Sequence, residues 1–167
     1  MIKIGILSDT HCTLIPQLFH FFKDVVELWH AGDIGSIETA DALAAFKPVR
    51  AVHGNIDNYV VRAQYPEDLF FHVEVVDVFM THIGGYPDHY MPEVKTILKA
   101  KKPDLFICGH SHILKVIYDK KLNLLHINPG AAGNSGFQKQ ITFIRMVIEG
   151  KTFKDMEIFE IDRNQVF

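Results

Sequence analysis

The sequence contains only two cysteines, Cys12 and Cys108, among its 167 residues. Two cysteines are too few for a disulfide framework, and we expect both thiols to be reduced. The chain also lacks an apolar run of the roughly 18 residues that a membrane-spanning helix requires. Its first residues show neither the basic segment nor the small-residue cleavage site of a secretory signal. These absences predict a cytoplasmic protein with no membrane partner.

An excess of basic residues is missing as well. Lysine and arginine number 17 against 20 aspartates and glutamates, which gives a net charge of -3. Proteins that bind duplex nucleic acid usually carry clustered lysine and arginine, so no duplex nucleic acid is expected as a partner. No low-complexity linker interrupts the chain, and 48% of its residues are hydrophobic. We therefore expect a single domain over residues 1–167.

Apolar runs alternate with helical patterns along the first third of the chain. The spacing predicts strands over 3–7, 28–30 and 49–53, and helices over 14–26 and 36–46. This order favours a parallel sheet, in which ligands collect beyond the carboxyl ends of the strands. Further on, the patterns predict strands over 69–75, 76–81 and 105–108, a helix over 92–101, and then only strands, over 114–118, 123–128, 140–149 and 155–161. A second sheet is therefore expected, in an α/β fold.

Polar segments follow five of these strands: Asp9-Thr10-His11, Gly32-Asp33, Gly54-Asn55-Ile56-Asp57, Thr81-His82, and Gly109-His110-Ser111-His112. Carboxylate, imidazole and amide groups suit divalent manganese, iron, zinc or nickel, whereas a thiolate-rich set would indicate structural zinc. Taken alone, Gly32-Asp33 is more often a turn and His82 a core histidine. The order of all five segments therefore carries the inference of a catalytic metal site.

In this order the segments resemble the signature of the calcineurin-like metallophosphoesterase superfamily, which runs D-x-H, G-D, G-N, an isolated H, and G-H-x-H. The resemblance spans residues 5 to 112. The short chain, the G-N-x-D form of the third motif and the Asn128-Pro129-Gly130 segment look closest to the small bacterial and archaeal phosphodiesterases of the family. The resemblance implies a two-sheet β-sandwich flanked by helices, a four-layer arrangement.

The resemblance also implies a ligand set of seven residues: Asp9, His11 and His112 for one metal ion, Asn55, His82 and His110 for the other, and Asp33 bridging both. The implied cofactors are two divalent metal ions, with manganese as first choice and iron, zinc or nickel as alternatives. Two such ions, about 3.5 to 4 Å apart, turn a bridging water into a hydroxide and stabilise the oxygens of an in-line displacement at phosphorus.

The expected function is that of a phosphodiesterase acting on a small-molecule phosphate ester. One alternative is a phosphomonoesterase or nucleotide pyrophosphatase that uses the same metals. Another is a protein-interaction module similar to the retromer scaffold subunit of this superfamily. Filled ligand positions favour the enzyme, because a pure scaffold does not require seven such side chains to converge.

One position departs from the pattern of the family. Many family phosphatases carry a histidine directly after the motif asparagine, and Ile56 stands in that place here. General acid catalysis is worth about 10² to 10⁴ in rate, so we expect modest turnover and a preference for good leaving groups. Replacement proton donors are sought among His53, Asp57 and His89. Asp57 is expected to orient Asn55 or a metal-bound water. The catalytic residues expected are Asp33, Asn55, Asp57 and His89.

Several other residues are given ordinary roles. Cys12 is expected to point away from His11 as a bystander. The glycine-rich segment 128–136 either turns tightly between strands or offers N–H groups to an anion, and the turn is favoured. His30 is expected to support the site, and His20, His72 and His126 are assigned to packing or to the surface. Phe159 and Phe167 leave room for a homo-oligomer.

Overall fold

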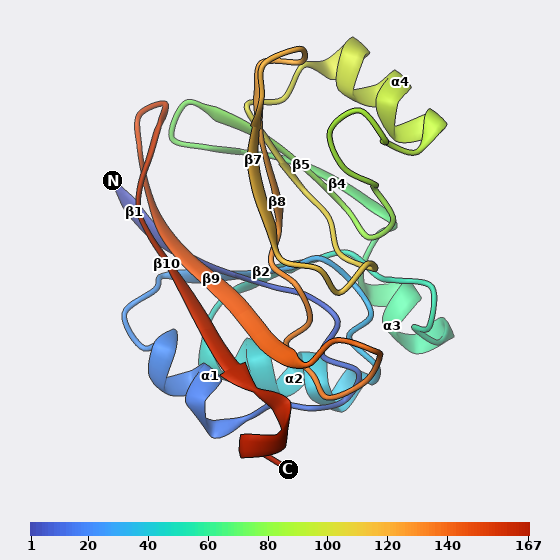
Figure 1. Cartoon of the computed structure of the whole chain (residues 1–167), viewed down its shortest axis with the longest axis vertical. Helices are drawn as coiled ribbons and strands as arrows, with labels where there is room; N and C mark the ends of the chain where they lie inside the picture. Colours follow the sequence, from blue (N-terminus) through green and yellow to red (C-terminus); the bar gives the residue numbers. More distant parts are fainter.

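The computed structural model describes residues 1–167 and contains two five-stranded sheets that face each other, with helices outside them (Figure 1). The first sheet has the order β10-β9-β1-β2-β3. Its strands are β1 (Ile2–Leu7), β2 (Glu27–His30), β3 (Val49–Ala51), β9 (Gln140–Glu149) and β10 (Thr152–Asp162). Strands β1, β2 and β3 run parallel, and β9 is antiparallel to β1. This sheet therefore brings the carboxyl ends of three parallel strands to one edge.

Three helices accompany the first sheet: α1 (Pro16–Phe21), α2 (Ile37–Phe46) and α3 (Tyr59–Gln64). The outer face of the sheet packs on α1 and α2 through a buried cluster that includes Leu7, Leu18, Leu28 and Leu43. The Ser36 hydroxyl caps α2 by accepting a hydrogen bond from the Thr39 N–H, as expected for serine at a helix start. Helix packing thus holds the strand ends that carry the first three motifs.

The second sheet has the order β4-β5-β6-β8-β7. Its strands are β4 (Asp68–Val73), β5 (Val76–Thr81), β6 (Leu105–Ile107), β7 (Lys115–Asp119) and β8 (Leu124–Asn128), and α4 (Pro92–Lys101) covers its outer face. Val94 and Leu98 of α4 pack on Phe79 and Phe106 of the sheet. Two mixed sheets with flanking helices confirm the predicted α/β sandwich.

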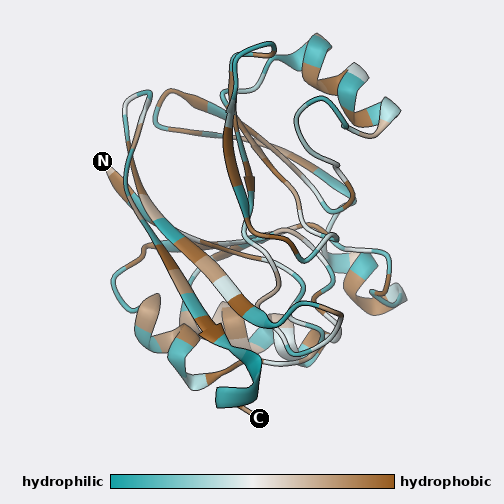
Figure 2. Ribbon diagram, viewed as in Figure 1, coloured by the Kyte–Doolittle hydropathy of each residue, from teal (hydrophilic) through white to brown (hydrophobic).

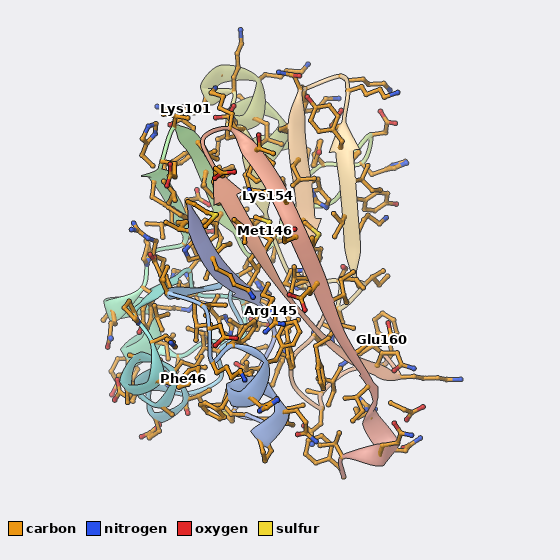
Figure 3. All side chains as sticks on the ribbon, turned by 90° about the vertical axis from the view of Figure 1, so that its left-hand side faces the viewer. Phe46, Lys101, Arg145, Met146, Lys154 and Glu160 are labelled. Atoms are coloured by element: carbon orange, nitrogen blue, oxygen red, sulfur yellow. The ribbon has the colours of Figure 1, made fainter.

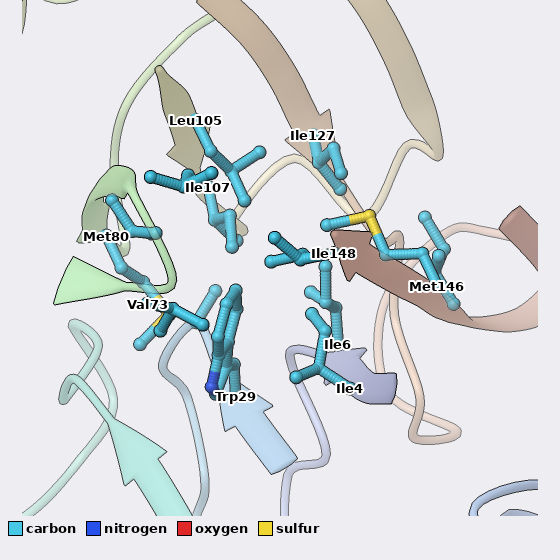
Figure 4. Packing of buried hydrophobic residues seen from close by; sticks show 14 of the residues in the cluster. Ile4, Ile6, Trp29, Val73, Met80, Leu105, Ile107, Ile127, Met146 and Ile148 are labelled. Carbon is cyan, nitrogen blue, oxygen red and sulfur yellow. The ribbon is translucent and has the colours of Figure 1, made fainter. Parts of the chain in front are cut away.

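The core lies between the sheets. Ile4, Ile6 and Trp29 of the first sheet face Ile107 and Ile127 of the second within one cluster of 15 buried residues (Figure 4). Figure 2 shows hydrophobic residues recurring along the strands among hydrophilic ones. Because side chains alternate between the two faces of a strand, each sheet presents one apolar face to this core. None of the helices is long and apolar enough to cross a lipid bilayer.

The predicted helix over 14–26 is wrong in its length. Helix α1 ends at Phe21, and the chain turns before β2 begins at Glu27. Val25 continues the apolar spacing of the helix but packs in the core from outside it, and the Val26 N–H donates to the Lys3 carbonyl. Helix α3 has no counterpart among the predicted elements. Asn58 begins it by accepting hydrogen bonds from the N–H groups of Val60 and Val61.

The strands beyond residue 112 do not form a sheet of their own. Strands β7 and β8 complete the second sheet, whereas β9 and β10 return to the first. Figure 3 shows the long β9–β10 ribbon, where Met146 and Arg145 are neighbours on β9. Met146 is buried in the core, and Arg145 pairs with Glu157 of β10 on the outer face. The choice of sheet depends on pairing between β9 and β1, which local spacing does not reveal.

Candidate metal centre

All five motif segments lie at or shortly after the carboxyl ends of strands, as predicted, but β3 ends at Ala51, two residues before the predicted end. Asp9, Asp33 and Asn55 follow β1, β2 and β3 of the first sheet. His82 and His110 follow β5 and β6 of the second sheet. The centre therefore forms where the strand ends of the two sheets meet, and each sheet supplies part of it.

One cluster consists of Asp9, His11 and His112, whose ligand atoms lie within 4.8 Å of one another. Nε2 of His112 is 3.1 Å from Oδ1 of Asp9, and Nε2 of His11 is 3.7 Å from the same oxygen. Two imidazole nitrogens thus converge on one carboxylate oxygen. The structure brings together the three side chains that the resemblance assigns to the first ion.

A second cluster consists of Asp33, His82 and His110, again within 4.8 Å. Nε2 of His82 lies 3.2 Å from Oδ2 of Asp33, and Asn55 joins through its Oδ1, 3.0 Å from Nδ1 of His110. The same Oδ2 of Asp33 is 3.5 Å from Nε2 of His11 in the first cluster. Asp33 therefore stands between the clusters, where a bridging carboxylate would have to be.

Buried polar atoms without partners point to metal ions. Oδ1 of Asp9, Nε2 of His11 and Nε2 of His82 are buried and form no hydrogen bond. Such atoms destabilise a fold unless something satisfies them, and all three belong to the two clusters. Carboxylate oxygens and imidazole nitrogens are ligands for manganese, iron, zinc and nickel. The residues present therefore fit two divalent cations, although binding itself stays a prediction.

The opposite atoms of the same side chains are held by neighbours. The Ser8 hydroxyl and the His110 N–H both donate to Oδ2 of Asp9, which leaves Oδ1 for the centre. Nδ1 of His82 lies 2.7 Å from the Ala31 carbonyl oxygen, which accepts its proton. Such outer contacts fix the tautomer and the orientation of metal-binding histidines.

Gln138 is a supporting residue that the sequence did not reveal. Its Oε1 lies 2.8 Å from Nδ1 of His112 and accepts the imidazole proton, so that Nε2 faces Asp9. The Gln138 amide nitrogen in turn donates to the Ser135 carbonyl. No motif marks this position. Its proximity to His112 depends on the path of the chain between β8 and β9.

The backbone is bent at most of these ligands. Five of them adopt positive φ angles, which are uncommon for residues other than glycine: Asp9 (54°), His11 (46°), Asp33 (54°), His110 (69°) and His112 (58°). Left-handed conformations in non-glycine residues cost free energy and cluster at functional sites. The fold thus maintains five unfavourable backbone conformations in order to aim these side chains inward.

Two motif glycines are required by close approach. A Cβ atom on Gly54 would lie 2.0 Å from Oδ1 of Asp33, and one on Gly109 would lie 2.0 Å from the Ser8 hydroxyl. Both distances are far shorter than any normal contact. Glycine before Asn55 and before His110 therefore allows the backbone to pass directly against the carboxylates and their partners.

The charges of the centre are strongly coupled. Burial would raise the pKa of Asp9, but the imidazoles of His11 and His112 outweigh this and hold it well below its usual range. Burial would lower the pKa of His82, but its contact with Asp33 raises it above the usual value. The pKa of His112 is raised chiefly by its close contact with the Asp9 carboxylate. Carboxylates are therefore ionised at neutral pH, and protons on these histidines compete with metal.

Asp57 is buried and holds two loops together. Its carboxylate accepts hydrogen bonds from the N–H groups of Ile34, Gly35 and Gly54, at 3.2, 2.7 and 2.8 Å. These donors flank Asp33 and Asn55 in the sequence. Asp57 thus positions the backbone that carries both ligands, and its oxygens are engaged in doing so.

His30 supports the same region from beneath. Its Nδ1 accepts the Gly32 N–H and its Nε2 contacts the Thr10 hydroxyl, both within 3.1 Å. The imidazole is completely buried and ties the turn before Asp33 to the residue beside Asp9. This is the supporting position that the sequence predicts for it.

The candidate proton donors lie in different surroundings. His53 lines a cavity of about 190 Å³ together with Asn55 and His82. His89 is exposed, packs against Tyr86 with ring centroids 4.9 Å apart, and does not line that cavity. Ile56, which stands where the resemblance leads us to expect a histidine, is exposed. Of the three candidate donors, only His53 lines this cavity with ligands assigned to the second ion.

The glycine-rich segment 128–136 braces the Asp9 turn. The N–H groups of Ala132 and Gly133 donate to the carbonyls of Ser8 and Asp9, which leaves neither for an anion. Cys12 is exposed and belongs to neither cluster. The chain at Cys12 is a turn with a φ of 67° and not the extended segment assumed from the sequence.

Comparison with known proteins agrees with this geometry. A family model described as the calcineurin-like phosphoesterase superfamily domain matches residues 2–151. A probable metallophosphoesterase from Methanothermobacter thermautotrophicus is 30% identical over 135 residues, which cover 77% of this chain and 76% of that protein.

Solved structures share the fold at lower identity. A structure described as a novel archaeal phosphodiesterase superimposes with a TM-score of 0.73 at 22% identity, covering 95% of this chain and all of that one. Vps29 from Chaetomium thermophilum gives a TM-score of 0.75 at 14% identity, covering 96% and 97% of the two chains. The same architecture thus occurs in a protein described as a phosphodiesterase and in Vps29.

Proposed function

Because the chain belongs to the calcineurin-like phosphoesterase superfamily, we propose that it is a metal-dependent phosphodiesterase acting on a small-molecule phosphate ester. The observation that carries the proposal is the convergence of three buried, unpartnered ligand atoms, Oδ1 of Asp9, Nε2 of His11 and Nε2 of His82. A phosphodiesterase among the proteins of this fold supports it.

Two divalent cations are the proposed cofactors, with manganese as first choice. Asp9, His11 and His112 would hold one ion, and Asn55, His82 and His110 the other, with Asp33 shared between them. When bound, such ions lower the pKa of a water ligand and neutralise charge on a phosphoryl group. The chain contributes the fixed geometry through Ser8, the Ala31 carbonyl and Gln138, which hold the ligand side chains in place.

The cavity beside the second cluster is the proposed substrate entrance. Besides His53, Asn55 and His82, it is lined by Arg62 and Glu67. The Arg62 guanidinium donates to the carbonyls of Gly54, Asn55 and Asp57, so it stiffens the asparagine loop. Most of its lining residues carry polar groups, and Ile83 is its hydrophobic residue. A polar ester group bound there would lie next to the ligands of the second ion.

His53 is the proposed proton donor in place of the missing histidine at Ile56. Its Nδ1 lies 2.8 Å from the Tyr65 carbonyl oxygen, which accepts that proton and fixes the ring. Nε2 is left to the cavity that His53 lines. A protonated His53 would transfer the Nε2 proton to the leaving oxygen and become neutral. Asp57 accepts hydrogen bonds from three N–H groups and His89 packs on Tyr86, outside the cavity, so both are weaker candidates for this role.

A phosphomonoesterase or nucleotide pyrophosphatase is the alternative reaction at the same ligands. Ile56 favours the diesterase, because the missing histidine would otherwise assist departure of a poor leaving group. The test is to purify the chain without chelator, measure bound metal, and compare bis-p-nitrophenyl phosphate with p-nitrophenyl phosphate in added manganese. Faster hydrolysis of the diester is expected, and hydrolysis of the monoester alone would favour the alternative.

A protein-interaction module is the second candidate, because Vps29 shares the fold. The enzyme is favoured because a residue suited to bind metal stands at every ligand position. Five of these residues adopt left-handed conformations, which cost free energy and which a scaffold would not require. If the purified protein holds no metal and hydrolyses neither ester with manganese added, the enzyme proposal is wrong and the module takes its place.

A further inference from the structure

His126 is buried without any hydrogen-bond partner, away from the metal clusters. Its side chain lies on β8 and is 0% exposed, and neither Nδ1 nor Nε2 has a partner. The ring lies beside Phe106 and Tyr90, with centroids 5.6 and 5.8 Å away. A neutral imidazole always carries one donor and one acceptor nitrogen. Leaving both unsatisfied in the interior destabilises a fold, so this ring requires an explanation.

A cavity of about 150 Å³ adjoins this histidine. His126, Lys115, Ser111 and Asn128 contribute polar groups to its lining, and Tyr86 and Ile113 expose large side chains there. In Figure 1 the strands β7 and β8 lie together at the edge of the second sheet, on which α4 also packs. Ser111 and Ile113 belong to the loop that carries His110 and His112. The cavity is therefore a neighbour of the metal centre, with a lining of its own.

Three hydrogen-bond donors of this lining are uncommitted. The Lys115 ammonium forms no salt bridge and lies 3.9 Å from the centroid of the Tyr86 ring. The Ser111 hydroxyl oxygen accepts from the Ile113 N–H and from the Asn128 amide, so its own proton remains to be donated. His126 adds one ring N–H. Each of these three side chains can therefore offer one donor to the cavity.

Two acceptors in the lining are already used. The side-chain amide oxygen of Asn128 accepts from the Gly130 N–H, and the Gly85 carbonyl accepts from the Cys108 thiol. No carboxylate lines the cavity. The nearby Asp119 is engaged by the Tyr90 hydroxyl and by the N–H groups of Lys121 and Leu122. The excess of donors and the unpaired positive charge are the properties of an anion site.

We propose that this cavity binds a compact oxyanion, a phosphate or carboxylate group, through Lys115, Ser111 and His126. The site is separate from the metal centre and does not depend on the proposed activity. A bound oxyanion would accept the His126 proton and pair with Lys115, so that one ring nitrogen and the ammonium gain partners. Burial, with the charge of Lys115 second, lowers the pKa of His126 to about 4, so the empty site holds a neutral ring that an anion would make easier to protonate.

The test follows the ring nitrogens of His126 by NMR in the zinc-loaded protein at constant pH. Inorganic phosphate and acetate are titrated separately. The proposal expects a saturable shift of the His126 signals, and the stronger of the two ligands identifies the oxyanion class. No shift with either anion at millimolar concentration would mean that the cavity holds water only, and the proposal would be overturned.

Matched variants locate the response. Lys115→Met should weaken the anion affinity at least 10-fold, whereas Lys115→Arg should retain most of it, because the positive charge remains. Lys120→Met removes the same charge from the exposed turn after β7 and should leave the affinity unchanged. An affinity in Lys115→Met equal to that of the unmodified protein would overturn the assignment.

The metal centre needs its own control, because it also offers positive charge when loaded. In Asp33→Asn, phosphate bound at the metal centre should be weakened, whereas the shift of His126 with phosphate should persist. Loss of the His126 response in that variant, with its fold intact, would show that the shift arises at the metal centre and would overturn the separate site.

Discussion

Nε2 of His82 lies 3.2 Å from Oδ2 of Asp33, although the two residues follow strands of different sheets. The imidazole is fixed from behind by the Ala31 carbonyl, and Ala31 lies two residues before Asp33. One sheet therefore orients a ligand of the other. This contact links the integrity of the sandwich to the integrity of the metal centre.

Asp33→Asn should lower both metal occupancy and diesterase activity. The substitution removes the negative charge that stands between the two clusters. Changes to outer partners of metal ligands cost about 10- to 100-fold, so loss of the shared ligand should reduce kcat/KM by more than about 100-fold. Metal analysis and hydrolysis of bis-p-nitrophenyl phosphate measure the two effects. Asp24→Asn, at an exposed position, is the matched control and should change neither quantity.

The strand ends were the predictable part of the site. Asp9, Asp33 and His110 could be placed because parallel strands deliver their next residues to one edge, and the sequence shows the strands as short apolar runs. The spacing of apolar residues within each segment did not predict that the two sheets meet at that edge. It depends on β9 pairing with β1, which joins residues more than 130 positions apart.

Supporting contacts were harder to predict than ligands. Gln138 reaches His112 across 26 residues, and glutamine at an irregular position carries no recognisable pattern. Asp57 was recognised as a candidate, but its engagement with three backbone N–H groups depends on how two loops approach each other. The positive φ angles of the ligands could not be predicted either, because such angles are uncommon in residues other than glycine.

Gln138→Ala should weaken metal binding with the fold intact. The variant leaves Nδ1 of His112 without its acceptor, so the ring loses its fixed tautomer and orientation. A loss of about 10- to 100-fold in affinity is expected, as for other outer partners of metal ligands. Competition with a chelator measures it. Gln165→Ala, at an exposed position near the C-terminus, should bind metal as tightly as the unmodified protein.

His53→Gln should slow hydrolysis of esters with poor leaving groups by about 10² or more, the range of general acid catalysis. Esters of p-nitrophenol should be affected much less, because that leaving group departs without a proton. Metal occupancy should not change. The measurement is kcat for a series of leaving groups of increasing pKa.

His89→Ala is the comparison for the same series. Its ring packs on Tyr86 outside the cavity that His53 lines, so we expect normal rates with all leaving groups. A leaving-group-dependent loss in His89→Ala, with normal rates in His53→Gln, would transfer the role of proton donor to His89. Normal rates in both variants would leave protonation to water.

Acid should destabilise the fold through His126. Burial, with Lys115 second, lowers its pKa to about 4 in the folded protein, whereas an unfolded histidine titrates near 6.5. Between these values the unfolded chain binds a proton that the folded chain does not, so stability present above pH 6.5 is lost as the pH falls toward 4. From pH 7 to pH 5 this one group should remove about 2 kcal/mol. Urea unfolding at both pH values, in a buffer without phosphate or carboxylate, measures the loss.

Other groups titrate in the same pH range, so the contribution of His126 is obtained by comparing the pH dependence of the unfolding free energy between variants. His126→Phe keeps an aromatic ring in the interior but has nothing to protonate, so its unfolding free energy should fall by about 2 kcal/mol less between pH 7 and pH 5. His20→Gln, at an exposed position, should retain the full pH dependence. Equal pH dependence in His126→Phe and the unmodified protein would mean that His126 is not buried as a neutral ring. Phosphate added to the unmodified protein should reduce the acid loss, because an anion beside His126 stabilises its protonated form.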